Sequence, residues 1–103
     1  MGSYSPVPSI DDDTLAGLSA MVHQPIVDLM ASRGHPFHGV LYAGLMMSSN
    51  GIKVLEYNTR FGDPETEVLL ARWKGDVLPL LLGSARGDLR GVEAAWSAPC
   101  ALT

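Results

Sequence analysis

The sequence predicts an α+β fold in which helices pack beside one antiparallel β-hairpin. Two largely apolar segments, Gly39–Ser48 and Ile52–Thr59, flank the dipeptide Asn50-Gly51. Because Asn and Gly tolerate positive φ, this dipeptide predicts a tight turn, and hence a hairpin of about 39–48 and 52–59. The first segment is apolar without alternation, which predicts a strand buried on both faces. Apolar residues at helical spacing before and after the hairpin predict the helices.

The segment before the hairpin predicts a helical region with a break inside it. Asp11–Asp13 offer N-cap side chains and a favourable charge at a helix start, and apolar residues follow at helical spacing. Pro25 interrupts this pattern, so we expect a kink or two abutting helices. Gly34 and Pro36 end the region.

The segment after the hairpin predicts two further helices. We expect the first to have Asp63 as its N-cap and Pro64 as its first residue, and to end at Gly75. Asp76 is then expected to cap a second helix that Gly87 closes.

Size and composition narrow the classes of function. The chain has 103 residues, of which 47% are hydrophobic and 17% charged, so it can build one modest domain. Its net charge of −4 argues against a general nucleic-acid-binding surface. Cys100 is the single cysteine, so no intrachain disulfide can form. The apolar runs are too short for a membrane span and no signal peptide is evident, so a cytoplasmic location is expected.

Three polar side chains near the end of the second hairpin segment indicate a candidate metal- and phosphate-binding site. If this strand is regular, Lys53 faces one side and the opposite side carries Ile52, Val54, Glu56, Asn58 and Arg60. Mg²⁺ prefers oxygen ligands, which Glu56 and Asn58 offer, and a guanidinium such as that of Arg60 grips phosphate with two hydrogen bonds. An ion pair between Glu56 and Arg60, with Asn58 opening a turn, is the alternative. Spacing alone favours that structural alternative.

Longer motifs around these residues carry a resemblance to a known family. Leu55-Glu-Tyr-Asn-Thr-Arg60 resembles the Glu-x-Asn strand of ATP-grasp enzymes, in which Glu and Asn hold Mg²⁺ against the nucleotide phosphates. Its continuation Arg60-Phe-Gly-Asp-Pro-Glu65 resembles the phosphoribosylamine–glycine ligase (glycinamide ribonucleotide synthetase) family. Met1-Gly-Ser-Tyr-Ser-Pro6, Gly39-Val-Leu-Tyr-Ala-Gly-Leu-Met46 and residues 70–96 are similar to that family in the same order.

The resemblance implies a partial ATP-grasp domain and a function. ATP would phosphorylate the glycine carboxylate, and the amine of 5-phosphoribosylamine would displace phosphate, as a step of purine biosynthesis. Glu56 and Asn58 would bind Mg²⁺ (or Mn²⁺), and Asn58 and Arg60 would contact the nucleotide. Arg60 would also stabilise the transferred phosphoryl group, while Gly62 and Asp63 would line the substrate pocket. The partners would be these small molecules and the missing parts of the enzyme, with no nucleic acid or membrane.

Members of this family are much longer than this chain, so we expect it to be a fragment that is inactive alone. Residues 1–87 would form the C-terminal part of the ATP-grasp domain. Residues 88–103 would be a linker and the truncated start of a C-terminal domain, with a short strand at 92–96.

Two alternative functions remain open. The chain could be a non-catalytic remnant that keeps the ancestral hairpin. It could also belong to another ATP-grasp ligase or to a biotin-dependent carboxylase, which shares a Glu-x-Asn-x-Arg strand. Phe61-Gly-Asp-Pro64 and Tyr4-Ser-Pro6 argue against this last alternative.

Overall fold

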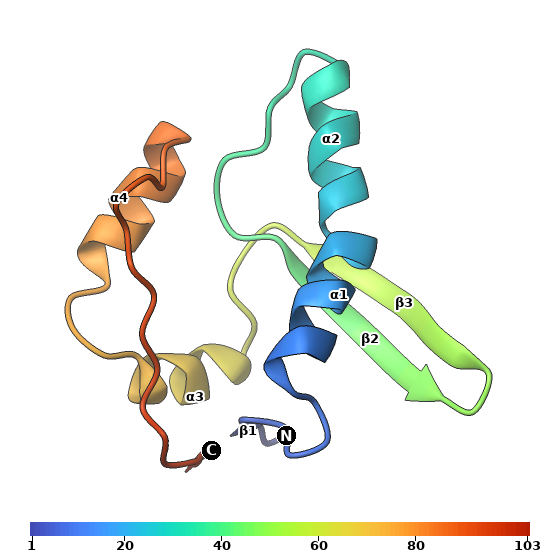
Figure 1. Ribbon diagram of the computed structural model, residues 1–103, viewed down its shortest axis with the longest axis vertical. Helices are drawn as coiled ribbons and strands as arrows, with labels where there is room; N and C mark the ends of the chain where they lie inside the picture. The colour runs from blue at the N-terminus through green and yellow to red at the C-terminus, as the bar shows by residue number, and fades with distance from the viewer.

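A computed structural model describes all residues, 1–103. Figure 1 shows α1, α2 and the long hairpin on one side of the molecule and α3, α4 and the C-terminal segment on the other. In chain order the elements are β1 (Tyr4–Ser5), α1 (Asp12–Val22), α2 (Gln24–Ser32), β2 (Tyr42–Ser48), β3 (Gly51–Asn58), α3 (Glu65–Arg72), α4 (Leu78–Arg86) and β4 (Ala101–Leu102). They form two two-stranded antiparallel sheets, β1–β4 and β2–β3.

The predicted hairpin is confirmed, with β2 beginning three residues later than expected. Ser48 pairs with Gly51 across the turn, and Gly51 has a φ of 96°, which glycine adopts without strain. The prediction that the first strand is buried on both faces is wrong. β2 is half-buried as far as Leu45 and exposed from Met46 onward. Met46 and Met47 point to opposite faces, so the turn end of the hairpin is uncovered on both.

The break before Pro25 is also confirmed. α1 ends at Val22 and α2 begins at Gln24, so two helices abut at His23. The α1 N-cap is Asp11, whose carboxylate accepts a 2.8 Å hydrogen bond from the backbone N–H of Thr14. The hydrogen bonds from Thr14 hold the pKa of the Asp11 carboxyl below its ordinary value.

The second half of the chain corrects several expectations. α3 runs from Glu65 to Arg72, not from Pro64 to Gly75, and its N-cap is Pro64, so Asp63 does not cap it. Residues 92–96 form no strand: only Trp96 makes a bridge, with Trp73, and the two rings meet edge to face at 5.2 Å. Asp76 does not occupy the N-cap of α4 either, because Val77 does, but its carboxylate accepts a 2.9 Å hydrogen bond from the backbone N–H of Leu78, the first residue of α4.

The two ends of the chain meet beside α3. β1 pairs with β4, and the guanidinium of Arg72 donates to the hydroxyl of Ser5 at 2.7 Å and to the carbonyl of Ser97 at 3.1 Å. Arg72 therefore ties the N-terminal and C-terminal segments to the same helix.

The core is small for a chain of this length. Val22 and Val68 are its only buried hydrophobic residues, at 5% and 2% exposure. The accessible surface is 7529 Å², whereas a compact protein of 11.0 kDa exposes roughly 5,600 Å². The radius of gyration, 14.5 Å, likewise exceeds the value of about 13 Å for a compact domain of this length. Much apolar surface thus stays uncovered within this chain. None of its helices has the length and apolar character that crossing a bilayer requires.

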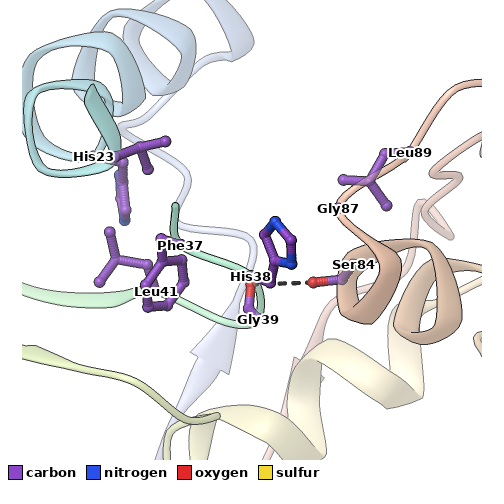
Figure 2. Close-up of a pocket in the computed structure, with 9 residues that line it drawn as sticks. His23, Phe37, His38, Gly39, Leu41, Ser84, Gly87 and Leu89 are labelled. Atoms are coloured by element: carbon purple, nitrogen blue, oxygen red, sulfur yellow. Dashed lines mark hydrogen bonds between the residues drawn. The ribbon is translucent and has the colours of Figure 1, made fainter. Parts of the chain in front are cut away.

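The glycine that closes α4 leads to a first prediction about stability. Gly87 has a φ of 71° and donates to the carbonyl of Ser84, and Asp88 donates to that of Gly83. Gly87 and His38 line the same pocket (Figure 2), and a Cβ on Gly87 would lie 2.5 Å from the ring of His38. We therefore expect Gly87→Ala to lower the free energy of unfolding by at least about 1–2 kcal/mol, the cost of a left-handed alanine. Urea denaturation followed by circular dichroism measures this.

The matched control is Gly17→Ala in the middle of α1, where a Cβ would meet nothing within 4 Å. This substitution should raise stability by roughly 1 kcal/mol, because alanine favours a helix interior more than glycine does. Equal effects of the two substitutions would contradict the structural account of Gly87.

Candidate functional site

The site takes its geometry from an irregularity in the hairpin. The pairing runs regularly from Ser48–Gly51 to Leu45–Val54, and then Gly44 pairs with Glu56, so Leu55 has no partner. This extra residue is a β-bulge in β3. It shifts the alternation of β3 side chains by one position between Val54 and Glu56.

The bulge corrects the prediction that Glu56 and Asn58 share a face with Ile52 and Val54. Residues directly opposite one another in an antiparallel pair share a face, and so do alternate residues of β2. One face therefore carries Tyr42, Gly44 and Met46 with their partners Asn58, Glu56 and Lys53. We call it the carboxylate face. The other carries Ala43, Leu45 and Met47 with Tyr57, Val54 and Ile52. Lys53 thus lies on the carboxylate face, contrary to expectation.

The two faces have different neighbours. The hydroxyl of Tyr57 donates to the carbonyl of Val22 at the end of α1 at 2.9 Å, so α1 lies against the face opposite the carboxylate face. Figure 1 shows this helix crossing in front of the hairpin. Glu56 is exposed and Asn58 half-buried, so the carboxylate face remains open to solvent at its polar end.

Glu56 and Asn58 point toward the same place. The amide nitrogen of Asn58 donates to Oε1 of Glu56 at 3.0 Å, and the Glu56 side chain crosses over Gly44, whose Cβ would lie 3.3 Å from it. Glu56 makes no ion pair with Arg60, since the single salt bridge of the chain joins Arg90 to Asp88. The structural alternative of a Glu56–Arg60 ion pair is therefore not what the chain adopts.

This pair fits a small divalent cation. Adjacent ligands of an octahedral Mg²⁺, each at 2.0–2.1 Å, stand about 2.9 Å apart. The 3.0 Å between the ends of Glu56 and Asn58 matches that spacing, once the Asn58 amide turns its oxygen toward the carboxylate. No group of three or more His, Cys, Asp or Glu side chains gathers in this chain. Two oxygens are what this chain offers, and Mg²⁺ takes its remaining ligands from water and phosphate in sites of this kind.

The other predicted site residues lie in the turn between β3 and α3. Arg60 is exposed and donates to the adjacent carbonyl of Phe61 at 2.8 Å, so its guanidinium remains available to an anion. Gly62 is buried and Asp63 exposed. The carbonyl of Gly62 accepts hydrogen bonds from both the amide and the hydroxyl of Thr66, which fix it against the first turn of α3.

Tyr42 joins this turn to the hairpin. Its hydroxyl donates to Oε1 of Glu65, the first residue of α3, at 3.2 Å. Burial and the negative charge of Glu65 raise the pKa of the Tyr42 hydroxyl above its ordinary value, and Glu56 adds to this shift while Arg60 opposes it. Tyr42 therefore stays a protonated donor at neutral pH.

The raised pKa of Tyr42 predicts how stability depends on alkaline pH. The folded chain holds this proton more tightly than the unfolded chain, so the stabilisation is complete below pH 10 and is lost as pH rises through the folded pKa. Phenolate absorbance should show a component that titrates above the ordinary range, and Tyr42→Phe should remove it. Persistence of that component in Tyr42→Phe would contradict the assignment.

Residues 1–66 match the model of the phosphoribosylglycinamide synthetase ATP-grasp (A) domain. The chain belongs to this family. The family assignment and the partial ATP-grasp fold predicted from the motifs are thereby confirmed.

Curated relatives of this family member are phosphoribosylamine–glycine ligases. The chain is 48% identical to that of Leptospira interrogans over 92% of its own length and 22% of the relative's. It is 48% identical to that of Streptomyces coelicolor over its whole length and 25% of the relative's. A crystal structure of the Thermotoga maritima ligase aligns with 99% of this chain and 25% of that one, with a TM-score of 0.75 and 32% identity. The chain thus spans about a quarter of the length of these relatives.

Sequence reasoning missed the positions of Tyr42, Glu65 and Lys53. For Lys53 a signal was present: Val54 and Leu55 are two apolar residues in a row, where strict alternation would place a polar one. A doubled apolar residue in an otherwise alternating strand is what a bulge produces. For Tyr42 and Glu65 no local signal exists, because their contact joins residues 23 positions apart.

Proposed function

We propose that this chain supplies the metal- and phosphate-binding end of a ligase that joins glycine to 5-phosphoribosylamine with ATP. One observation carries the proposal. Glu56 and Asn58 bring a carboxylate and an amide to within 3.0 Å of each other on an open face, without a cationic partner. A carboxylate held in this way is suited to a hard cation.

Each site residue has a role in this proposal. Glu56 and Asn58 hold Mg²⁺ or Mn²⁺, and the guanidinium of Arg60 contacts the phosphate being transferred. When bound, the cation neutralises phosphate charge and orients the nucleotide. Asp63 presents its exposed carboxylate to the acceptor substrate, and the buried Gly62 shapes the turn that carries it on this side of the substrate pocket.

The proposed reaction has two steps. An oxygen of the glycine carboxylate attacks the γ-phosphorus of ATP, the bond to ADP breaks, and an acyl phosphate forms. The amine nitrogen of 5-phosphoribosylamine then attacks the acyl carbon, phosphate leaves with the bonding electron pair, and the nitrogen loses a proton. Arg60 stabilises the negative charge that the phosphoryl group carries in the first step.

The activity requires parts that this chain does not contain. It spans 22–25% of the length of its curated relatives, and two protein oxygens give little metal affinity without phosphates. We propose that residues 1–87 complete an ATP-grasp domain and that 88–103 lead toward a following domain. The isolated chain should bind ATP and Mg²⁺ weakly and should not turn over.

The test supplies the remaining segments of a relative, such as the Streptomyces coelicolor ligase, in trans. Glycine- and phosphoribosylamine-dependent release of ADP from the mixture, and from neither part alone, would support the proposal. A mixture that associates yet stays inactive, with no Mn²⁺ bound at millimolar concentration, would support the alternative of a non-catalytic remnant.

A further inference from the structure

One hydrogen bond alone connects the hairpin to α3. It runs from the hydroxyl of Tyr42 to Oε1 of Glu65, over 3.2 Å. The other side-chain hydrogen bonds of β2 and β3 stay within the hairpin or reach α1, and no backbone hydrogen bond joins the hairpin to α3. Between the two elements runs the turn 59–64, which carries three of the proposed site residues: Arg60, Gly62 and Asp63.

The Glu65 side chain also packs against the turn 59–64 itself. Its second carboxylate oxygen lies against Gly62, so closely that a Cβ at that position would overlap it. The carbonyl of Gly62 is bound in turn by the amide and hydroxyl of Thr66. Gly62 is buried, with the Glu65 carboxylate against it on one side and Thr66 bound to its carbonyl.

Tyr42 itself is placed by the strand register. It pairs directly with Asn58 and lies on the carboxylate face, one side-chain position along from Gly44 and Glu56. The side chain of Tyr42 therefore leaves the strand beside the proposed metal ligands, and its hydroxyl reaches the Glu65 carboxylate, which lies against the turn.

We propose that Tyr42 is a positioning residue for the proposed ligase site: through Glu65 it fixes the turn that carries Arg60, Gly62 and Asp63 relative to Glu56 and Asn58. The inference rests on the proposed function for its consequence in catalysis. Its structural part, the fixing of the turn, stands independently. Tyr42 itself touches neither metal nor substrate in this proposal.

The test compares Tyr42→Phe with Tyr57→Phe. Both remove one phenolic hydroxyl from the same strand pair, but Tyr57 donates to Val22 on the opposite face. Hydrogen exchange is followed at the amides of Thr66 and Glu67, which donate to the carbonyls of Gly62 and Pro64. Tyr42→Phe should speed this exchange about fivefold, the effect of one typical hydrogen bond, and Tyr57→Phe by less than twofold.

A second pair of variants separates positioning from charge. Gln at position 65 still offers a carbonyl oxygen to Tyr42, so Glu65→Gln should keep most of the protection that Glu65→Ala loses. Equal exchange in Tyr42→Phe, Tyr57→Phe and the unaltered chain would overturn the inference. Exchange at the unprotected rate in the unaltered chain would overturn it as well.

The catalytic consequence is measured in the enzyme reconstituted in trans. Tyr42→Phe should leave the Mn²⁺ dissociation constant unchanged within twofold, because both proposed ligands remain, while kcat/KM for glycine falls about tenfold or more. If Tyr42→Phe shows the exchange difference but the reconstituted enzyme with the unaltered chain has no activity, the proposed function is wrong and the turn contact stands. Activity without any exchange difference would do the reverse.

Discussion

In the reconstituted enzyme, Glu56→Gln should lower kcat by on the order of 10²–10³-fold, the cost of removing one charge-stabilising group from a polar active site. The side chain keeps its size and can still accept a hydrogen bond from Asn58, which now donates to it at 3.0 Å. The negative charge that attracts a divalent cation is gone. The Mn²⁺ dissociation constant, followed by electron paramagnetic resonance in the presence of ATP, should rise in parallel.

Glu93→Gln is the matched control for this loss. Glu93 is exposed, lies in the segment between α4 and β4, and makes no hydrogen bond or salt bridge. Its replacement should change kcat and Mn²⁺ affinity by less than twofold. If Glu56→Gln behaves like Glu93→Gln, Glu56 is not a metal ligand and the proposed function loses its central observation.

The isolated chain should associate with itself and melt below the range of about 45–65 °C that is usual for mesophilic domains. It exposes roughly 1,900 Å² more than a compact protein of its mass, and four apolar residues of the hairpin are among those exposed: Met46, Met47, Val54 and Leu55. Both outer edges of β2 and β3 also lack a partner strand. Addition of the remaining segments of a ligase should raise the melting temperature, because they cover this surface.

Sedimentation velocity and calorimetry measure this behaviour. Leu55→Lys, at a side chain 63% exposed on the hairpin, should reduce self-association and also weaken reconstitution. Leu15→Lys, at a comparably exposed position of α1, should do neither to the same extent. A monomer with one sharp transition well above about 65 °C would show that the chain is a self-sufficient domain.

The elements that could be predicted from sequence are those with local causes. Asn50-Gly51 sets the turn, the acidic run supplies the cap of α1, and Pro25 separates α1 from α2. Each depends on a backbone preference or a hydrogen bond within three or four residues. Asp63 failed as a predicted cap because Pro64 occupies the N-cap position itself.

The candidate site, too, was predictable from the sequence only in part. That Glu56 and Asn58 share a face was predictable from their spacing of two, and the structure brings their ends together. Which face they share was not, because the bulge at Leu55 reverses the relation between these residues and Ile52.

By itself the sequence determined the family of this chain, its hairpin and the pairing of Glu56 with Asn58, since all three follow from neighbouring residues. Only the tertiary structure decided that Lys53 lies on the carboxylate face and that Tyr42 reaches Glu65 across the turn. The reason is physical: strand register and contacts between distant segments depend on how whole elements pair and pack. No local preference in the sequence encodes them.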